Sequence, residues 1–170
     1  MTTGKGILAA ALLTGAAVFA QDAHHQGVNA VVNPGVNPGV DQRGDHVMGF
    51  SHEKTTHHFL LYKDGGAIEV TANSASDTES RDQVQMHLGH IAGMFAKGNF
   101  QAPMLVHDKT PPGVPALEKL KDQVTYQFSK TERGGTIRIT TRNGEALAAV
   151  HEFLRFQIAD HRTGDTGEVK

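Results

Sequence analysis

Two stretches of the chain repeat one pattern of residue types. They read Gly-Gly-Ala-Ile-Glu-Val-Thr at 65–71 and Gly-Gly-Thr-Ile-Arg-Ile-Thr at 134–140. Alternating apolar and polar residues of this kind are typical of a β-strand. A second strand-like run precedes each stretch across a glycine-rich turn, at 56–63 and at 124–128. The pattern therefore predicts two β-hairpins.

A helix is predicted after each hairpin. Asp77 is a suitable N-cap for the first, whose buried stripe would be Val84, Leu88, Ile91 and Phe95 before Gly98 ends it. The second runs from about residue 144 to 159 on a similar stripe. We expect an α+β fold: pseudo-duplicated ββα units forming a four-stranded antiparallel sheet, with two main helices on one face. The seven matching residues could also reflect hairpin composition alone, and the architecture is the same in either case.

The N-terminus predicts export. Residues 1–20 combine a short basic start with an unbroken run of small and apolar residues, which is typical of a cleavable signal peptide. Val18 and Ala20 match what a signal peptidase reads, so we expect cleavage before Gln21. The apolar run is shorter than the ~20 residues of a membrane span, although an uncleaved anchor is the alternative. We expect a periplasmic or secreted chain with no membrane span after cleavage.

The remaining chain is expected to form one domain with flexible ends. A tandem Asn-Pro-Gly-Val at 33–40 predicts a flexible, extended linker over 21–46. A single α+β domain is expected over 47–162, followed by a C-terminal tail at 163–170. Within the domain, the proline-rich segment 101–115 is expected to be largely irregular, and a short helix is expected at 116–121.

The chain has eleven histidines and no cysteine. A metal would therefore be bound by nitrogen, oxygen or thioether sulfur. The formal net charge of −2 gives no reason to expect nucleic acid as a partner.

Five side chains form the predicted metal site. His87 and His90 lie one turn apart on the first predicted helix, and Met94 continues the same flank. The adjacent His57 and His58 point to opposite faces of a strand, so at most one can join a site. His107 lies in the proline-rich segment with Asp108 beside it, whereas His151 is expected to be a hydrogen-bonded core histidine. The predicted ligands are His87, His90, His58 and His107, with Met94 as auxiliary.

Copper is the favoured metal, because imidazole and thioether ligands in an oxidising compartment suit it, and zinc or nickel comes next. Non-covalent haem is an alternative cofactor, with a sheet face bearing Phe59, Leu61 or Tyr126 against the porphyrin. A small enzyme with His107 or His87 as general base, oriented by Asp108, is another alternative. A partner-binding surface, such as a homodimer interface on an open sheet face, is the last.

The sequence contains no complete catalytic motif of a known enzyme class. The segment 52–57 has one residue too many for the zinc-protease pattern, and there is no nucleophile elbow, phosphate loop or dinucleotide fingerprint. The sequence therefore predicts a binding protein rather than an enzyme.

Five segments carry a resemblance to a known group of proteins: TTHHF at 55–59, HLGHI at 87–91, HDKTPPGV at 107–114, HEFLRFQI at 151–158 and DHRTGD at 160–165. Over about Met48 to Asp165 the chain resembles a family of small, exported, histidine-rich bacterial proteins. The resemblance implies a domain of about these bounds. It implies no particular reaction or ligand.

Overall fold

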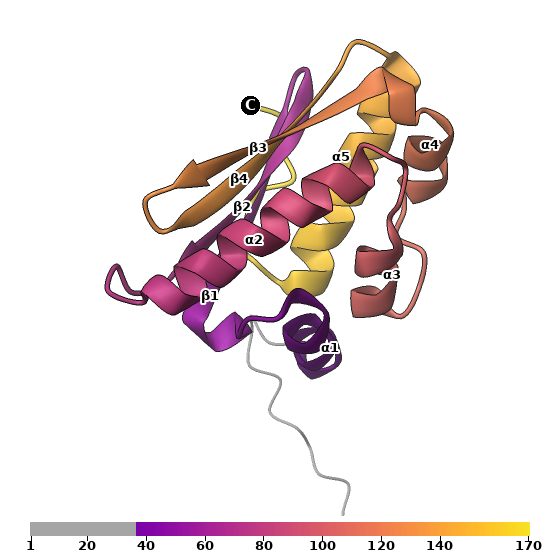
Figure 1. Cartoon of the computed structure of the whole chain (residues 1–170). Coiled ribbons are helices and arrows are strands. Elements are labelled where there is room, and N and C mark those ends of the chain that lie inside the picture. The colour runs from indigo at the N-terminus through magenta and orange to yellow at the C-terminus, as the bar shows by residue number, and fades with distance from the viewer. Residues whose placement is uncertain (1–36) are drawn as a thin grey trace, which may run out of the picture. The chain divides into compact units, whose positions relative to one another are not determined.

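The computed structural model describes residues 37–170. Four strands form one antiparallel sheet in the order β1-β2-β4-β3 (Figure 1). They are β1 (Thr55–Tyr62), β2 (Gly65–Ala72), β3 (Val124–Thr131) and β4 (Gly134–Thr141). The helices α2 (Thr78–Phe95) and α5 (Gly144–His161) pack side by side on one face of this sheet. The predicted α+β fold with a four-stranded antiparallel sheet is confirmed.

The two ββα units match each other closely. In the β2–β4 pairing Gly65 lies opposite Thr140 and Gly134 opposite Thr71, so the repeated stretches face each other symmetrically. A Cβ on either glycine would collide with a backbone carbonyl of the other central strand, which explains why both hairpins carry glycine there. Both helices have 18 residues.

The caps of these helices are equivalent as well. Asp77 accepts a hydrogen bond from the backbone N–H of Ser80, and Asn143 accepts one from that of Ala146. Positions on α2 and α5 can therefore be compared by counting from the two caps.

The core lies between the sheet and the two long helices. Inward-facing strand residues meet the apolar stripes of α2 and α5 and are almost completely buried. Burial of such side chains is the main favourable term for a domain of this size. The cluster includes Phe59, Leu61, Ile68, Val70, Ile137, Ile139, Val84, Leu88, Val150 and Leu154.

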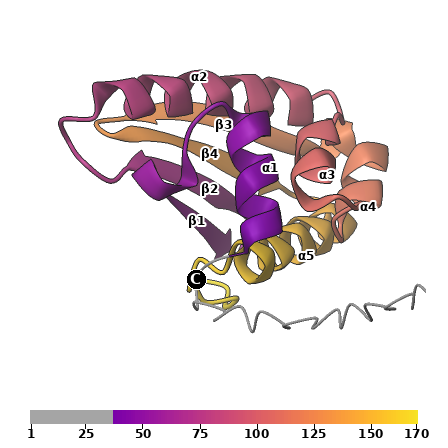
Figure 2. The same ribbon diagram turned by 90° about the horizontal axis from the view of Figure 1, so that it is seen from below.

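The predicted linker ends earlier than residue 46. Residues 21–36 lie outside the described residues, as does the predicted signal peptide, but α1 (Pro38–Met48) is a helix that packs on the domain. Proline at the first position of a helix loses no hydrogen bond, so the Pro-Gly sequence starts this helix instead of preventing it. Seen from below, α1 runs across the space between α2 and α5 (Figure 2).

The segment 101–115 also differs from its prediction. It contains α3 (Gln101–His107), in which Pro103 lies in the first turn, where a missing N–H is tolerated. The predicted short helix is α4 (Val114–Lys119). Two short 3₁₀ segments, His52–Lys54 and Lys121–Gln123, lead into β1 and β3.

The C-terminal tail packs against the edge strand β1. Val169 forms a parallel bridge with Leu61, and the backbone N–H of Lys170 donates to the Leu61 carbonyl at 3.0 Å. Asp165 accepts a hydrogen bond from the backbone N–H of Phe59 at 2.9 Å. The domain therefore continues beyond residue 162. Within residues 37–170, no helix is both long and apolar enough to cross a membrane.

Candidate functional site

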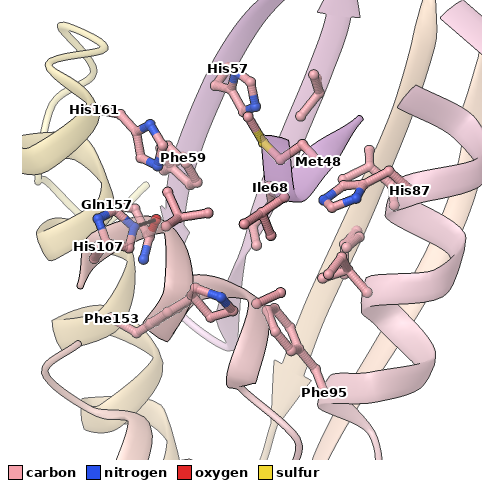
Figure 3. Close-up of a pocket in the computed structure, with 18 residues that line it drawn as sticks. Met48, His57, Phe59, Ile68, His87, Phe95, His107, Phe153, Gln157 and His161 are labelled. Carbon is pink, nitrogen blue, oxygen red and sulfur yellow. Dashed lines mark hydrogen bonds between the residues drawn. The ribbon is translucent and has the colours of Figure 1, made fainter. Parts of the chain in front are cut away.

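A small apolar cavity of about 70 Å³ lies between the sheet and the helices (Figure 3). Both long helices contribute to its wall, β1 and the central strands form its floor, and α1 and α3 close it. The side chains that carry polar or sulfur atoms come from five elements: Met48 (α1), His57 (β1), His87 (α2), His107 (α3), Gln157 and His161 (α5).

The two long helices present the same pair of residue types in opposite order. Counted from the N-caps, His87 of α2 is equivalent to Phe153 of α5, and Phe95 of α2 is equivalent to His161 of α5. All four line the cavity. On α5, Phe153, Gln157 and His161 follow one another at steps of four residues, which places them along one side of the helix.

Burial keeps three of the cavity histidines neutral. Removal from water lowers the pKa of His57 to about 4, with the neighbouring His87 adding to the effect. Burial likewise lowers the pKa of His87 to about 4, assisted by His90, and that of His161 to about 3, assisted by His57 and His107. At neutral pH these rings are uncharged imidazoles, the form that can bind a metal.

The same three histidines have no polar partner in the described part of the chain. Their ring contacts are aromatic: the His57 and His161 rings are nearly parallel with centroids 5.7 Å apart, and Phe50 lies 5.5 Å from His87. By contrast, Nδ1 of His52 lies 3.0 Å from Asp45 Oδ1, and Nδ1 of His58 lies 2.8 Å from Asp165 Oδ1. The three rings are half-buried, and their nitrogens stay accessible enough to take a ligand in place of water.

His107 belongs to a hydrogen-bonded network at the cavity wall. Its Nδ1 lies 2.5 Å from Asp160 Oδ2, and its Nε2 lies 2.9 Å from Gln157 Oε1. Both ring nitrogens therefore face side-chain oxygen atoms of α5. The Nε2 of Gln157 is buried and has no partner within residues 37–170.

A second hollow, of about 160 Å³ and with more polar walls, adjoins the cavity. Met48, His57 and His161 line both hollows and so form their common boundary. The outer hollow also includes Asp41, His52 and several threonines. A ligand bound at the boundary would have a polar route on one side and a small apolar cavity on the other.

The structure brings together only part of the predicted metal set. His87 and His107 line the cavity, but His90 is exposed on α2 and Met94 packs against the core. At 100° per residue, His87 lies about 70° from the centre of the buried stripe of α2 and His90 about 130° from it. His58 points to the other face of the sheet, where its Nδ1 lies 2.8 Å from Asp165 Oδ1.

Sequence reasoning missed two of the site histidines. His57 shares its strand face with Phe59 and Leu61, which are the most deeply buried residues of β1, and this parity was the available signal. The other is His161. It follows Phe153 and Gln157 at steps of four, which marks it as part of their stripe although it ends the helix.

No group of three or more His, Cys, Asp or Glu side chains among residues 37–170 is arranged to hold a metal ion. The thioether of Met48 is therefore the third donor that the boundary position offers beside His57 and His161. His151 is hydrogen-bonded as expected, since its Nε2 lies 2.9 Å from the Tyr62 carbonyl and 3.0 Å from that of Gly65, but it is half-buried and lies outside the core. Comparisons of the chain with protein-family models, with curated proteins and with solved structures gave no match.

Proposed function

We propose that the protein binds a transition-metal ion, with copper favoured, at the boundary between the two hollows. His57 and His161 would supply imidazole nitrogens and Met48 a thioether sulfur. The observation that supports this proposal is the convergence of neutral histidines without hydrogen-bond partners in the described chain. A neutral imidazole needs no proton displaced before it binds a metal.

The separation of the two rings is compatible with one shared ion, and because the rings are stacked nearly parallel, at least one would turn to direct its nitrogen at the metal. With metal–nitrogen bonds of about 2.0 Å, two imidazoles on one ion have ring centroids roughly 5–6 Å apart. The His57 and His161 centroids are 5.7 Å apart. Two nitrogens and one thioether form a soft set of low coordination number, which suits Cu(I) better than zinc or calcium. Export to the periplasm or outside the cell, which we propose from residues 1–20, is in keeping with copper.

The alternatives fit less well. Pockets that hold drug-sized or larger ligands enclose about 300–1,000 Å³, so a cavity of about 70 Å³ does not accommodate a porphyrin in this conformation. A general base at His107 would need an unoccupied nitrogen, but both of its nitrogens have partners. Asp108, which was expected to orient His107, is exposed, and Asp160 takes that position instead.

Copper titration of the metal-free full chain would test this proposal. We expect one Cu(I) per chain in an anaerobic competition with a chromophoric Cu(I) chelator. His57→Ala and His161→Ala should each weaken binding at least tenfold, and Met48→Leu should also weaken it. The matched controls are His90→Ala and His58→Ala, which remove histidines that do not line the cavity.

Each variant should first be shown to unfold in urea at a midpoint near that of the wild type. Equal Cu(I) affinity in the two cavity variants and the two controls would contradict the proposed site. Loss of binding in His90→Ala alone would move the site to the outer flank of α2.

A further inference from the structure

The inner cavity contains a polar group that the proposed metal site does not use. Gln157 is only 4% exposed and lines the cavity wall (Figure 3). Its Oε1 is engaged by His107, whereas its Nε2 has no acceptor within residues 37–170. An amide N–H that is removed from water needs an acceptor, because the folded chain otherwise loses a hydrogen bond that the unfolded chain makes with water.

The network around His107 holds this amide in place. Asp160 fixes Nδ1 of His107, and Lys109 Nζ lies 3.6 Å from the other carboxylate oxygen. The edge of the ring packs on Phe156, with the centroids 4.8 Å apart. The Oε1 of Gln157 is therefore held by His107, and its Nε2 is the side of the amide left for another partner.

The rest of the cavity defines what could accept this hydrogen bond. The remaining wall is mostly apolar, with Phe59, Phe95 and Phe153 among its members. The wall gives an anion no cationic side chain to pair with, because no Lys or Arg of residues 37–170 lines the cavity. A cavity of about 150 Å³ holds benzene, so one of about 70 Å³ has space for roughly three non-hydrogen atoms, and the adjoining outer hollow gives room for one more.

We propose that the inner cavity binds a small neutral molecule through one acceptor oxygen, which takes the free N–H of Gln157 while the apolar remainder packs against the phenylalanines. Gln157 and His161 are one turn apart on α5, so this molecule would lie next to the proposed metal position. The inference rests on the cavity and on Gln157, and it does not depend on the metal.

Acetone and isobutene form a matched pair of probes. They share a branched frame of four non-hydrogen atoms and differ in a carbonyl oxygen against a methylene group. In metal-free, ¹⁵N-labelled full chain, we expect acetone to shift the side-chain amide signals of Gln157 saturably. Isobutene should bind about fivefold more weakly or not at all, because it offers no acceptor.

Gln157→Leu keeps a side chain of similar size and removes the donor. It should reduce acetone affinity to that of isobutene, whereas Gln127→Leu on the exposed face of β3 should have no effect. Equal binding of the two probes, no response to acetone, or unchanged acetone binding in Gln157→Leu would each overturn the inference. The wild-type amide signals keep the test valid if the variant fails to fold.

Copper titration separates this inference from the proposed function. Gln157→Leu should lose acetone binding and retain Cu(I) affinity, because Gln157 is not a proposed ligand. If the wild type took up no copper but responded to acetone as expected, the metal proposal would fail and the inner-cavity site would stand.

Discussion

His107 shows how one residue organises the cavity wall. Its side chain is 1% exposed. Its two nitrogens connect α3 to α5, where they contact Asp160 and Gln157. The contact with the Asp160 carboxylate should contribute most to holding this ring, because a hydrogen bond to a charged group is stronger than one between neutral groups. The ring also contacts His161, with the centroids 5.0 Å apart, so its placement affects a proposed metal ligand.

Asp160→Asn should therefore destabilise the domain. We expect the free energy of unfolding to fall by about 1–3 kcal/mol, because the amide is a weaker acceptor for the His107 N–H than the carboxylate. Urea denaturation at pH 7.5 would measure the change. Asp108→Asn is the matched control, because Asp108 is exposed with φ of 53°, a conformation that asparagine tolerates well. Equal effects of the two substitutions would show that the His107–Asp160 contact contributes little.

The difference between His57 and His58 shows a limit of the sequence at this scale. Strand alternation requires the two rings to point to opposite faces, and this was predicted correctly. The strand marks its buried face only weakly, because Leu60 and Tyr62 on the face of His58 are as apolar as Phe59 and Leu61 on the face of His57, so packing of α5 decides between them. The partner of His58, Asp165, comes from a tail more than a hundred residues later, so no local pattern indicated it.

At the scale of elements, α1 is the most loosely held helix around the cavity. Only Val40 and Gly44 are buried among its residues. Met48 packs against the core at one end, and two further anchors are polar: Arg43 Nε donates to the Val106 carbonyl of α3 at 2.8 Å, and Asn37 Nδ2 donates to the Asp160 carbonyl of α5 at 3.1 Å. Elements with few buried apolar contacts open at low free-energy cost. Because Val47 and Met48 line the cavity, opening of α1 would expose it.

Arg43→Ala should make this opening easier. We expect amide hydrogen exchange over residues 38–48 to become several-fold faster, with exchange in the four strands unchanged, because the substitution removes an anchor without touching the core. Exchange followed by mass spectrometry would report both regions in one sample. Arg81→Ala on the surface of α2, where Arg81 pairs only with the neighbouring Asp82, is the control and should leave residues 38–48 unaffected. A uniform acceleration over the whole domain would indicate global destabilisation instead.

Elements with strong periodicity were the most predictable part of the fold. The stripes of α2 and α5 and the two glycine-turn hairpins follow from spacing alone, because one buried face fixes the period. α1 and α3 were not predicted, since each is short, contains proline and gains its stability from packing on neighbours. The cavity lies under these two helices, so the sequence indicated the histidines without indicating how they are enclosed.

At the scale of the whole molecule, the buried neutral histidines make stability depend on pH. In the unfolded chain a histidine has a pKa near 6.5, whereas burial lowers the pKa of His57 and His87 to about 4 and that of His161 to about 3. Asp45 raises the pKa of His57 and Asp160 that of His161, but both effects are smaller than that of burial. At a pH between the folded and the unfolded pKa of these histidines, the unfolded chain binds more protons than the folded one.

The metal-free protein should therefore be most stable above about pH 6.5 and lose stability as the pH falls towards 4. At pH 5 each of the three histidines should cost about 2 kcal/mol relative to neutral pH, a total comparable to the whole stability of many domains.

His87→Phe removes one titrating group that is not a proposed ligand and keeps an aromatic ring. Urea denaturation at pH 7.5 and at pH 5 would give the loss of unfolding free energy on acidification. This loss should be about 2 kcal/mol smaller in His87→Phe than in the wild type. His90→Ala should retain most of the wild-type dependence, because His90 is exposed and its effect on the pKa of His87 is smaller than that of burial. If both variants followed the wild-type curve, the ring of His87 would be fully solvated in the folded protein, and the argument that the cavity withdraws this ring from water would fail.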